Sequence, residues 1–318
     1  MPLPSSIPQL SDMNASISVI GSSNWDMTMQ LSHLPAAGET VTGASSHSCL
    51  GGKGANQAVA AARAGGDVFF LSCIGEDATA AQVKQELQEN QLDTGGLLSI
   101  SGEETGKAMI FVDAAGENCI AVADGANARL TPAILQQHQQ QLAMSSTLLL
   151  QMEIPTETVL AAARMGKENE QLVILNPAPA ARFDREILTW VSILTPNRVE
   201  MEQICGRELG NEQALCEAAQ ELLGQGPEAI IVTLGKDGAI LITSTEQTSF
   251  DAYAVEARDT TAAGDVFNGA LAAGLSRNWA YAKAINFAVA AAAISVQRPG
   301  AIPSIPRRQE IEALLESQ

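Results

Sequence analysis

Short runs of continuous apolar residues alternate with alanine-rich helical stretches along most of the chain. After Gly51 these runs are Val68–Cys73, Leu148–Met152, Leu172–Leu175, Ile193–Thr195 and Ile230–Leu234. Another short strand, Ile17–Gly21, precedes them. A strand that is apolar on both sides is buried on both faces, and such strands form parallel sheets covered by helices. The pattern therefore predicts an α/β fold with a mainly parallel central sheet.

Two segments break this alternation and are typical of exposed strands. The first extends from Met27 to about Leu50. In the second, Thr105 to about Asp124, the apolar runs Ala108–Val112 and Cys119–Val122 flank a turn at Ala115–Asn118. That spacing predicts a β-hairpin. We expect both segments to belong to a small sheet beside the main domain.

The charge balance limits the kinds of partner. The 318 residues carry 18 Lys and Arg against 36 Asp and Glu, a formal net charge of −18. Nucleic acids and anionic membranes are bound through basic patches, so neither is expected as a partner. A small phosphate-bearing ligand remains compatible, because backbone amides, a few local cations and a metal can hold it.

The chain shows no sign of export or membrane insertion. Its first Lys or Arg is Lys53, whereas secretory signals and transit peptides need early positive charges. The apolar segment Phe287–Val296 is shorter than the roughly 20 residues of a membrane span and predicts a buried helix. We expect a cytoplasmic protein. Residues 1–15 are polar and proline-containing, which predicts a flexible tail.

Cysteines and histidines give no evidence of a disulfide framework, zinc site or hydrolase triad. The five cysteines are odd in number and form no C-x-x-C pair, which favours buried reduced thiols. The three histidines lie far apart and outside any H-E-x-x-H motif.

A glycine-rich turn, Gly51-Gly-Lys-Gly-Ala-Asn56, leads into a helical stretch at Gln57–Ala64. Glycine allows the backbone to approach a ligand or to adopt positive φ, so this turn is either a ligand loop or simply a tight entry into a helix. It is not a P-loop. The pattern G-x-x-x-x-G-K-[ST] requires Ser or Thr after the lysine, whereas Gly54 follows Lys53.

Small residues precede an acid at the start of an apolar helix in Asp259-Thr-Thr-Ala-Ala-Gly-Asp265. Free amides at a helix start bind anions, and the helix dipole strengthens this binding. An aspartate there can accept a proton from a hydroxyl while the amides hold charge on a transferring phosphoryl group. Alternatively, Asp265 only caps the helix.

Taken together, these two segments resemble the two signatures of the PfkB (ribokinase-like) carbohydrate-kinase family. Gly51–Ala58 with Gly65 resembles the N-terminal signature, and Asp259–Ala272 resembles the C-terminal one, in the same order. Further similarity lies in Gly21–Asp26, Pro35–Thr42, Asn176–Pro179, Thr195–Asn197 with Glu200, and Thr233–Gly238. The resemblance covers residue 16 to the end.

The resemblance implies a three-layer α/β sandwich over residues 16–318. A small β-sheet lid would be formed by about 27–50 and 105–124. In related proteins the lid often pairs two subunits, so a homodimer is expected. Trp25, between Asn24 and Asp26, departs from the small or aliphatic residue usual in the family.

The implied activity is ATP-dependent phosphorylation of D-ribose at O5, giving ribose 5-phosphate and ADP. Asp265 would take the hydroxyl proton, and the amides of Ala263, Gly264 and Asp265 would form the anion hole. Related kinases acting on 2-deoxyribose, fructose or a nucleoside are the alternative. A non-catalytic sensor on this fold is a remoter one, because it would be expected to lack Asp265 or Gly264.

The resemblance also assigns the binding residues. Those around the sugar are Asn24, Asp26, Gly52, Lys53, Gly54, Ala55, Asn56, Glu153 and Asp265. Those for ATP are Asn197, Thr233, Leu234, Gly235, Lys236, Asp237, Gly238, Gly264 and Asp265. Mg²⁺ would be held through water by Asn197 and Glu200. A K⁺ site behind the anion hole would use Asp259, Thr261, Ser295, Arg298, Gly300 and Ser304.

Two carboxylates have a chemical reason for their assignment beside the resemblance. Asp26 and Glu153 suit the vicinal hydroxyls of a sugar. Glu153 also follows the strand at Leu148–Met152, and ligands of open α/β sheets bind at the carboxyl ends of the strands. The alternative for Glu153 is a cap on the helix that follows Pro155.

Overall fold

The computed structural model describes residues 16–43 and 45–317, and the predicted tail at 1–15 lies outside them. A nine-stranded sheet forms the centre, in the order β13-β12-β11-β10-β9-β8-β1-β4-β5. Its strands are β1 (Ser16–Ile20), β4 (Asp67–Ile74), β5 (Leu97–Ser99), β8 (Thr147–Leu150), β9 (Leu172–Leu175), β10 (Ile193–Leu194), β11 (Ala229–Thr233), β12 (Ala239–Thr243) and β13 (Gln247–Phe250).

The sheet is parallel from β5 to β11, as the continuous apolar runs predicted. Strand β1 pairs in parallel with both β4 and β8, and β10 pairs in parallel with β9 and β11. Strands β12 and β13 add an antiparallel hairpin at one edge. The predicted α/β class with a mainly parallel sheet is confirmed.

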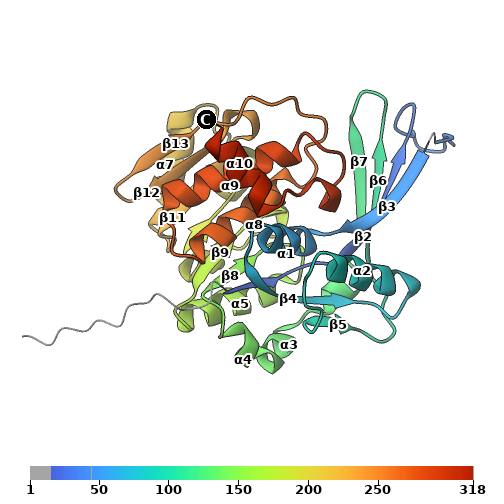
Figure 1. The fold of residues 1–318 in the computed structure, drawn as a ribbon, viewed down its shortest axis with the longest axis horizontal. Coiled ribbons are helices and arrows are strands. Elements are labelled where there is room, and N and C mark those ends of the chain that lie inside the picture. Colours follow the sequence, from blue (N-terminus) through green and yellow to red (C-terminus); the bar gives the residue numbers. More distant parts are fainter. Residues whose placement is uncertain (1–15, 44, 318) are drawn as a thin grey trace, which may run out of the picture.

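Helices cover both faces of the central sheet (Figure 1). One layer holds α1 (Lys53–Arg63), α2 (Ala78–Glu89), α8 (Ala263–Leu275), α9 (Tyr281–Ser295) and α10 (Arg308–Glu316). The other holds α3 (Pro132–Gln137), α4 (Gln139–Leu142), α5 (Thr156–Glu168), α6 (Arg198–Cys205) and α7 (Glu212–Leu223). Short 3₁₀ turns are η1 (Gly125–Arg129), η2 (Ala180–Arg182), η3 (Arg185–Trp190), η4 (Gly235–Asp237) and η5 (Ile302–Ser304). Separate apolar cores lie on the two sides of the sheet, which gives the expected three layers.

A second, four-stranded sheet stands beside this body, in the order β3-β2-β6-β7 (Figure 1). Its strands are β2 (Asn24–Gln30), β3 (Ser45–Gly51), β6 (Gly106–Val112) and β7 (Asn118–Ala123). The β6–β7 pair is the predicted hairpin. Strand β2 starts earlier than the predicted Met27, because Asn24 already pairs with Gly51 and Gly106.

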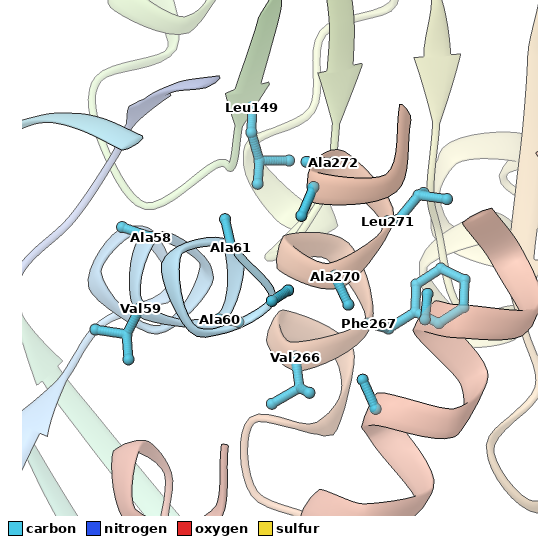
Figure 2. Packing of buried hydrophobic residues seen from close by; sticks show 14 of the residues in the cluster. Ala58, Val59, Ala60, Ala61, Leu149, Val266, Phe267, Ala270, Leu271 and Ala272 are labelled. Atoms are coloured by element: carbon cyan, nitrogen blue, oxygen red, sulfur yellow. The ribbon is translucent and has the colours of Figure 1, made fainter. Parts of the chain in front are cut away.

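Helices α1 and α8 pack closely enough to bring their first turns together. Figure 2 shows Ala60 and Ala61 of α1 on the side of the helix toward α8, which carries Val266 and Ala270. A Cβ atom on Gly269 would lie 2.5 Å from the Cβ of Ala60 and 2.6 Å from the carbonyl oxygen of Gln57. Small residues at this crossing therefore allow the backbone contact that sets Asp265 against the start of α1.

Helix α9 contains most of the apolar segment Phe287–Val296, and its side chains are largely buried between neighbouring elements. Across the described ranges 16–43 and 45–317, no helix combines the length and apolarity needed to cross a bilayer.

Candidate active site

The carboxylate of Asp265 is held between two side-chain amides from the first turn of α1. Asn56 Nδ2 donates to Asp265 Oδ2 over 3.0 Å, and Gln57 Nε2 donates to Asp265 Oδ1 over 3.0 Å. Asp265 is only 5% exposed. Each carboxylate oxygen retains a further lone pair, so the group is oriented by its neighbours and can still accept a proton.

The start of α8 presents unpaired backbone amides. Ala262 precedes the helix with φ of 60°, a left-handed conformation that turns the chain sharply into α8. Ala263 N donates to the carbonyl of Thr260 over 3.2 Å. Within residues 16–43 and 45–317, the amides of Gly264 and Asp265 have no hydrogen-bond acceptor. The predicted anion hole is therefore open at Gly264 and Asp265, whereas the Ala263 amide already has a partner.

Lys53 and the start of α8 line one cavity of about 220 Å³, together with Asn197, Glu200 and Asn268. The negative charges of Asp265, Glu153 and Glu200 raise the pKa of Lys53 and outweigh the effect of its burial. Lys53 therefore stays protonated beside the Asp265 carboxylate, and the cavity combines one cation, one base and free amides.

The glycines of the Gly51–Asn56 turn are needed for close backbone contacts. Gly52 has φ of 87° and is the residue before α1. A Cβ atom on Gly54 would lie 2.4 Å from the Ser22 nitrogen. The amides of Gly54 and Ala55 donate to Ser22 Oγ and Ser22 O over 3.3 and 2.9 Å. The backbones of the two loops thus touch, which places Gly52–Asn56 beside Asn24 and Asp26.

Glu153 joins the Ser22 loop to the start of α1. Its Oε2 accepts from Ser22 Oγ over 2.6 Å and from the Lys53 amide over 2.9 Å. Helix α5 begins after Pro155 and has no side-chain cap. Glu153 therefore does not cap this helix, and that alternative is wrong. The carboxylate instead satisfies the first amide of α1.

Asp26 is the most perturbed carboxylate of the site. Its pKa is raised from the ordinary 3.8 to about 7, chiefly by burial and in addition by the negative charges of Glu153 and Asp265. Its Oδ1 atom and Asn56 Oδ1 are both buried without a hydrogen-bond partner. A Cβ on Gly51 would lie 1.9 Å from Asp26 Oδ2, so only glycine fits beside this carboxylate. Two buried acceptors without a partner, on neighbouring elements of the site, suit a ligand that brings hydroxyl donors.

Asn127 of η1 completes this side of the site and was missed by the sequence analysis. Its Nδ2 donates to Asn24 Oδ1 over 2.8 Å, and its Oδ1 accepts from the Ser23 amide over 2.8 Å. Asn24, Asn127 and Glu153 line a cavity of about 80 Å³ with Asp124 and Arg182, which form an ion pair of 2.8 Å.

Trp25 lies away from this pocket. Successive residues of β2 point to opposite faces of the small sheet, so Trp25 faces away from Asn24 and Asp26. It packs against the apolar core of the main body. The departure at Trp25 therefore affects the packing of β2 and not the face that carries Asn24 and Asp26.

A second cavity, of about 360 Å³, adjoins the start of α8 on the other side. Of the residues predicted to bind ATP, Thr233, Gly235, Lys236 and Gly238 line it, and Gly264 lines both this cavity and the first one. Leu234 and Asp237 are not among its lining residues. Most of its wall was missed by the sequence analysis and is apolar: Ala252, Tyr253, Ala254, Val255, Ala257, Phe267, Val289, Ala292, Ala293 and Val296. Such an apolar wall, next to the free amides of α8, suits a flat heterocyclic ring.

Asn197 and Glu200 lie at the start of α6 and form a reciprocal capping box. Asn197 Oδ1 accepts from the Glu200 amide, and Glu200 Oε2 accepts from the Asn197 amide, each over 2.8 Å. Burial raises the pKa of Glu200. Both residues also line the 220 Å³ cavity, so the capping box does not remove them from it.

The loop around Asp259 is tied to the loop after α9. Asp259 Oδ2 accepts from the Gly300 amide over 2.7 Å, and Oδ1 accepts from the Thr261 amide over 2.9 Å. Burial tends to raise the pKa of Asp259, but these hydrogen bonds outweigh it and lower the pKa below 3.8. The hydroxyls of Ser295 and Ser304 donate to nearby carbonyls, and Arg298 pairs with Glu310.

Comparison with known proteins agrees with this geometry. Residues 14–308 match the model of the pfkB family of carbohydrate kinases. A ribokinase of Haemophilus influenzae is 41% identical, covering 96% of this chain and 99% of its own.

Two solved structures are similar over nearly the whole chain. The Thermotoga maritima ribokinase superposes with a TM-score of 0.88 at 40% identity, covering 94% of this chain and 99% of its own. The Arabidopsis thaliana ribokinase, complexed with ribose and ATP, gives 0.90 at 29% identity, covering 96% and 99%. On this family match and these full-length similarities, the chain belongs to the pfkB family of carbohydrate kinases.

Proposed function

We propose that this protein transfers the γ-phosphoryl group of ATP to O5 of D-ribose, forming ribose 5-phosphate and ADP. Membership of a carbohydrate-kinase family and full-length similarity to ribokinases support this activity. The observation that carries it is the Asp265 carboxylate, oriented by two amides beside the unpaired amides of Gly264 and Asp265.

In the proposed reaction, the sugar hydroxyl approaches the Asp265 carboxylate and loses its proton to it as the new O–P bond forms. An alcohol is a weak acid, so the base acts late in the transfer. The Gly264 and Asp265 amides, with the dipole of α8, hold the charge on the phosphoryl oxygens. Lys53 places a cation in the same cavity. Positioning and electrostatics supply most of the catalysis, as in other phosphoryl transfers.

The sugar is proposed to lie between β2 and the start of α1. The free acceptors Asp26 Oδ1 and Asn56 Oδ1 take hydrogen bonds from its hydroxyls. Glu153 adds a carboxylate, and Asn24 is fixed in place by Asn127. The adenine ring is proposed to occupy the apolar cavity near Tyr253, which leaves the phosphates to reach Gly264.

Kinases that use ATP generally require Mg²⁺, which shields the phosphates. Within residues 16–43 and 45–317, no group of three or more His, Cys, Asp or Glu forms a metal cage. That result fits an ion held mainly by phosphate and water. Asn197 and Glu200 line the cavity, and Glu200 keeps one carboxylate oxygen outside the capping box, so both residues fit a role as water-mediated partners.

A monovalent cation is proposed beside the Asp259 loop, where it would order the anion hole. The carboxylate of Asp259 stays ionised, and each of its oxygens keeps a lone pair beyond the amide that it accepts. Arg298 contributes its backbone carbonyl in this proposal. Its guanidinium is positively charged, pairs with Glu310 and has no lone pair to offer to a cation.

Exchange of K⁺ for Na⁺ at constant ionic strength is expected to lower kcat several-fold, because the smaller ion fits the loop less well. The measurement is steady-state ADP release in the two salts. Asp259→Asn should reduce the difference between the salts. Equal rates in K⁺ and Na⁺ for the unaltered protein would contradict the cation site.

We also propose a cytoplasmic homodimer joined through the small sheet. Exposed apolar side chains occur on both faces of this sheet: Met27, Met29 and Met109 on one face, Ile120 and Val122 on the other. A small sheet with apolar residues on two sides is stabilised when a second copy covers one of them.

Light scattering at micromolar concentration is expected to give about twice the chain mass of 33.2 kDa. Ile120→Lys should shift the protein toward the monomer, because it places a charge in the proposed contact. Ile134→Lys, on the partly buried face of α3, serves as a control for any loss of stability. A wild-type mass near 33 kDa would rule out the dimer at that concentration.

A coupled ADP-release assay over ribose, 2-deoxyribose, fructose and adenosine tests the choice of acceptor. We expect the highest kcat/KM for ribose, because Asp26 and Asn56 present acceptors for adjacent hydroxyls, and 2-deoxyribose lacks one of these. A higher kcat/KM for any other acceptor would assign the protein to that substrate instead.

A further inference from the structure

A buried side-chain amide network lies behind the Asp265 carboxylate. Gln151 Nε2 donates to Gln57 Oε1 over 2.7 Å. Gln57 Nε2 then donates both to Asp265 Oδ1 and to Asn176 Oδ1, over 3.0 and 3.1 Å. Gln57 and Gln151 are both 0% exposed. All the polar atoms of the Gln57 side chain are therefore used inside the protein.

The same network reaches the backbone at the start of α8. Asn176 Nδ2 donates to the carbonyl of Thr195 over 3.1 Å, and Thr195 Oγ1 donates to Asn268 Oδ1 over 2.6 Å. Asn268 Nδ2 donates to the carbonyl of Gly264 over 2.8 Å. The proposed base and the proposed anion hole are thus connected through α1, the strand ends and α8.

The direction of the hydrogen bonds fixes the orientation of Gln57. Because Gln151 donates to Gln57 Oε1, the amino group of Gln57 must point toward Asp265 and Asn176. A flipped amide would set an oxygen against the Asp265 carboxylate and two amino groups against each other. In a buried setting both contacts are unfavourable, so only one orientation satisfies the network.

Gln57 differs from the other network members in its distance from the ligand. Asn176, Thr195 and Asn268 line the 220 Å³ cavity, whereas Gln57 and Gln151 line none of the described cavities at this site. An effect of Gln57 on turnover must therefore pass through Asp265 or its neighbours.

We propose that Gln57 is a positioning residue for phosphoryl transfer: held by Gln151, it fixes the Asp265 carboxylate relative to the amides of Gly264 and Asp265. This inference rests on the proposed kinase function. A base that is free to rotate reaches the productive geometry less often, and misplacement by about 1 Å can cost about 100-fold in rate.

The principal test is Gln57→Met, which keeps the length of the side chain and removes its hydrogen bonds. We expect kcat to fall about 10- to 100-fold while KM for the sugar stays within about threefold. Gln171→Met is the matched control. Gln171 is a buried glutamine that donates to the carbonyls of Leu142 and Ser145, at the opposite end of β9 from Asn176. Its loss should lower Tm and leave kcat unchanged.

A double variant separates positioning from general stability. If Gln57 acts through Asp265, adding Q57M to Asp265→Asn should change the residual kcat by less than about threefold. A loss equal to that of Q57M in the unaltered protein would show an effect independent of Asp265 and would overturn the proposal.

Gln151→Met provides a second, milder variant should Q57M fail to fold. Gln151 Oε1 has no hydrogen-bond partner, so the substitution removes one unsatisfied atom. The one side-chain hydrogen bond that it removes is the bond from Gln151 Nε2 to Gln57 Oε1. We expect kcat to fall in Q151M too, but by less than in Q57M.

All variants are assayed with ribose, or with whichever sugar the wild type uses best. A wild type that turns over another sugar refutes only the ribose assignment. An active wild type whose kcat is matched within twofold by folded Q57M and Q151M refutes the positioning role alone.

Discussion

Replacing Asp265 by Asn is expected to lower kcat by about 10²–10⁴-fold, with little change in KM for the sugar. Asparagine fills the same space but cannot take the hydroxyl proton. It also presents an amino group to Asn56 or Gln57, both of which donate to the carboxylate in the native protein. The measurement is steady-state ADP release over a range of sugar concentrations.

The Asp265→Asn experiment needs a control for folding and for nonspecific charge effects. Asp251→Asn serves this purpose, because Asp251 is exposed and lines none of the cavities described above. It should keep wild-type kinetics. If folded D265N retains kcat within about threefold of wild type, Asp265 is not the base.

Replacing Asp26 by Asn is expected to raise KM for the sugar about 10- to 1000-fold. A hydrogen bond to a charged group contributes about 1.5–3 kcal/mol, and two sugar hydroxyls are proposed to donate here. Because the buried Asp26 carboxylate is costly when ionised, the same substitution should raise Tm at pH 8. Thermal unfolding and sugar titrations measure the two effects.

The stability effect of Asp26 has a defined pH window. Its pKa rises from 3.8 to about 7 on folding, so the folded protein binds the proton more tightly than the unfolded chain. The resulting stabilisation is complete below about pH 4 and is lost as pH rises toward 7. D26N should therefore gain Tm over wild type at pH 8 more than at pH 5. A Tm difference independent of pH would contradict the assignment.

Sugar binding should follow the ionisation of the same group. The ionised carboxylate is the better acceptor, so KM for the sugar is expected to rise as pH falls from 8 to 6. Glu153, in the loop after β8, and Asp265, in α8, are unchanged in D26N. A pH dependence of KM that persists in D26N would contradict the assignment to Asp26.

Much of the fold can be predicted from the apolar pattern because buried parallel strands have few other options. Val68–Cys73 lies within β4 as expected, and Leu148–Leu150 of the second run lies in β8, which ends two residues before Met152. Strand β13 was missed because Gln247–Phe250 is short, polar and at the edge, and β5 has only three residues. Strand β12 was also missed, although Ala239–Thr243 is apolar and buried for most of its length.

Site residues are harder to predict from the sequence where their contacts join segments that lie far apart along the chain. Asn56 and Asp265 stand in recognisable motifs. Asn127 follows the hairpin in an unremarkable 3₁₀ turn, and its contact with Asn24 spans 103 positions. Gln57 sits beside a motif residue, yet its role depends on the α1–α8 contact that Gly269 permits. The apolar wall around Tyr253 has no motif at all.

The central claim is that Asp265 and the start of α8 transfer phosphate to one hydroxyl of ribose. The most direct measurement is ³¹P–¹H correlation NMR of the product made by the wild-type protein from ribose and ATP. We expect a phosphomonoester coupled to the C5 protons, formed together with ADP and missing when D265N replaces the wild type. Phosphate at another carbon, or no ribose phosphate at all, would contradict the account.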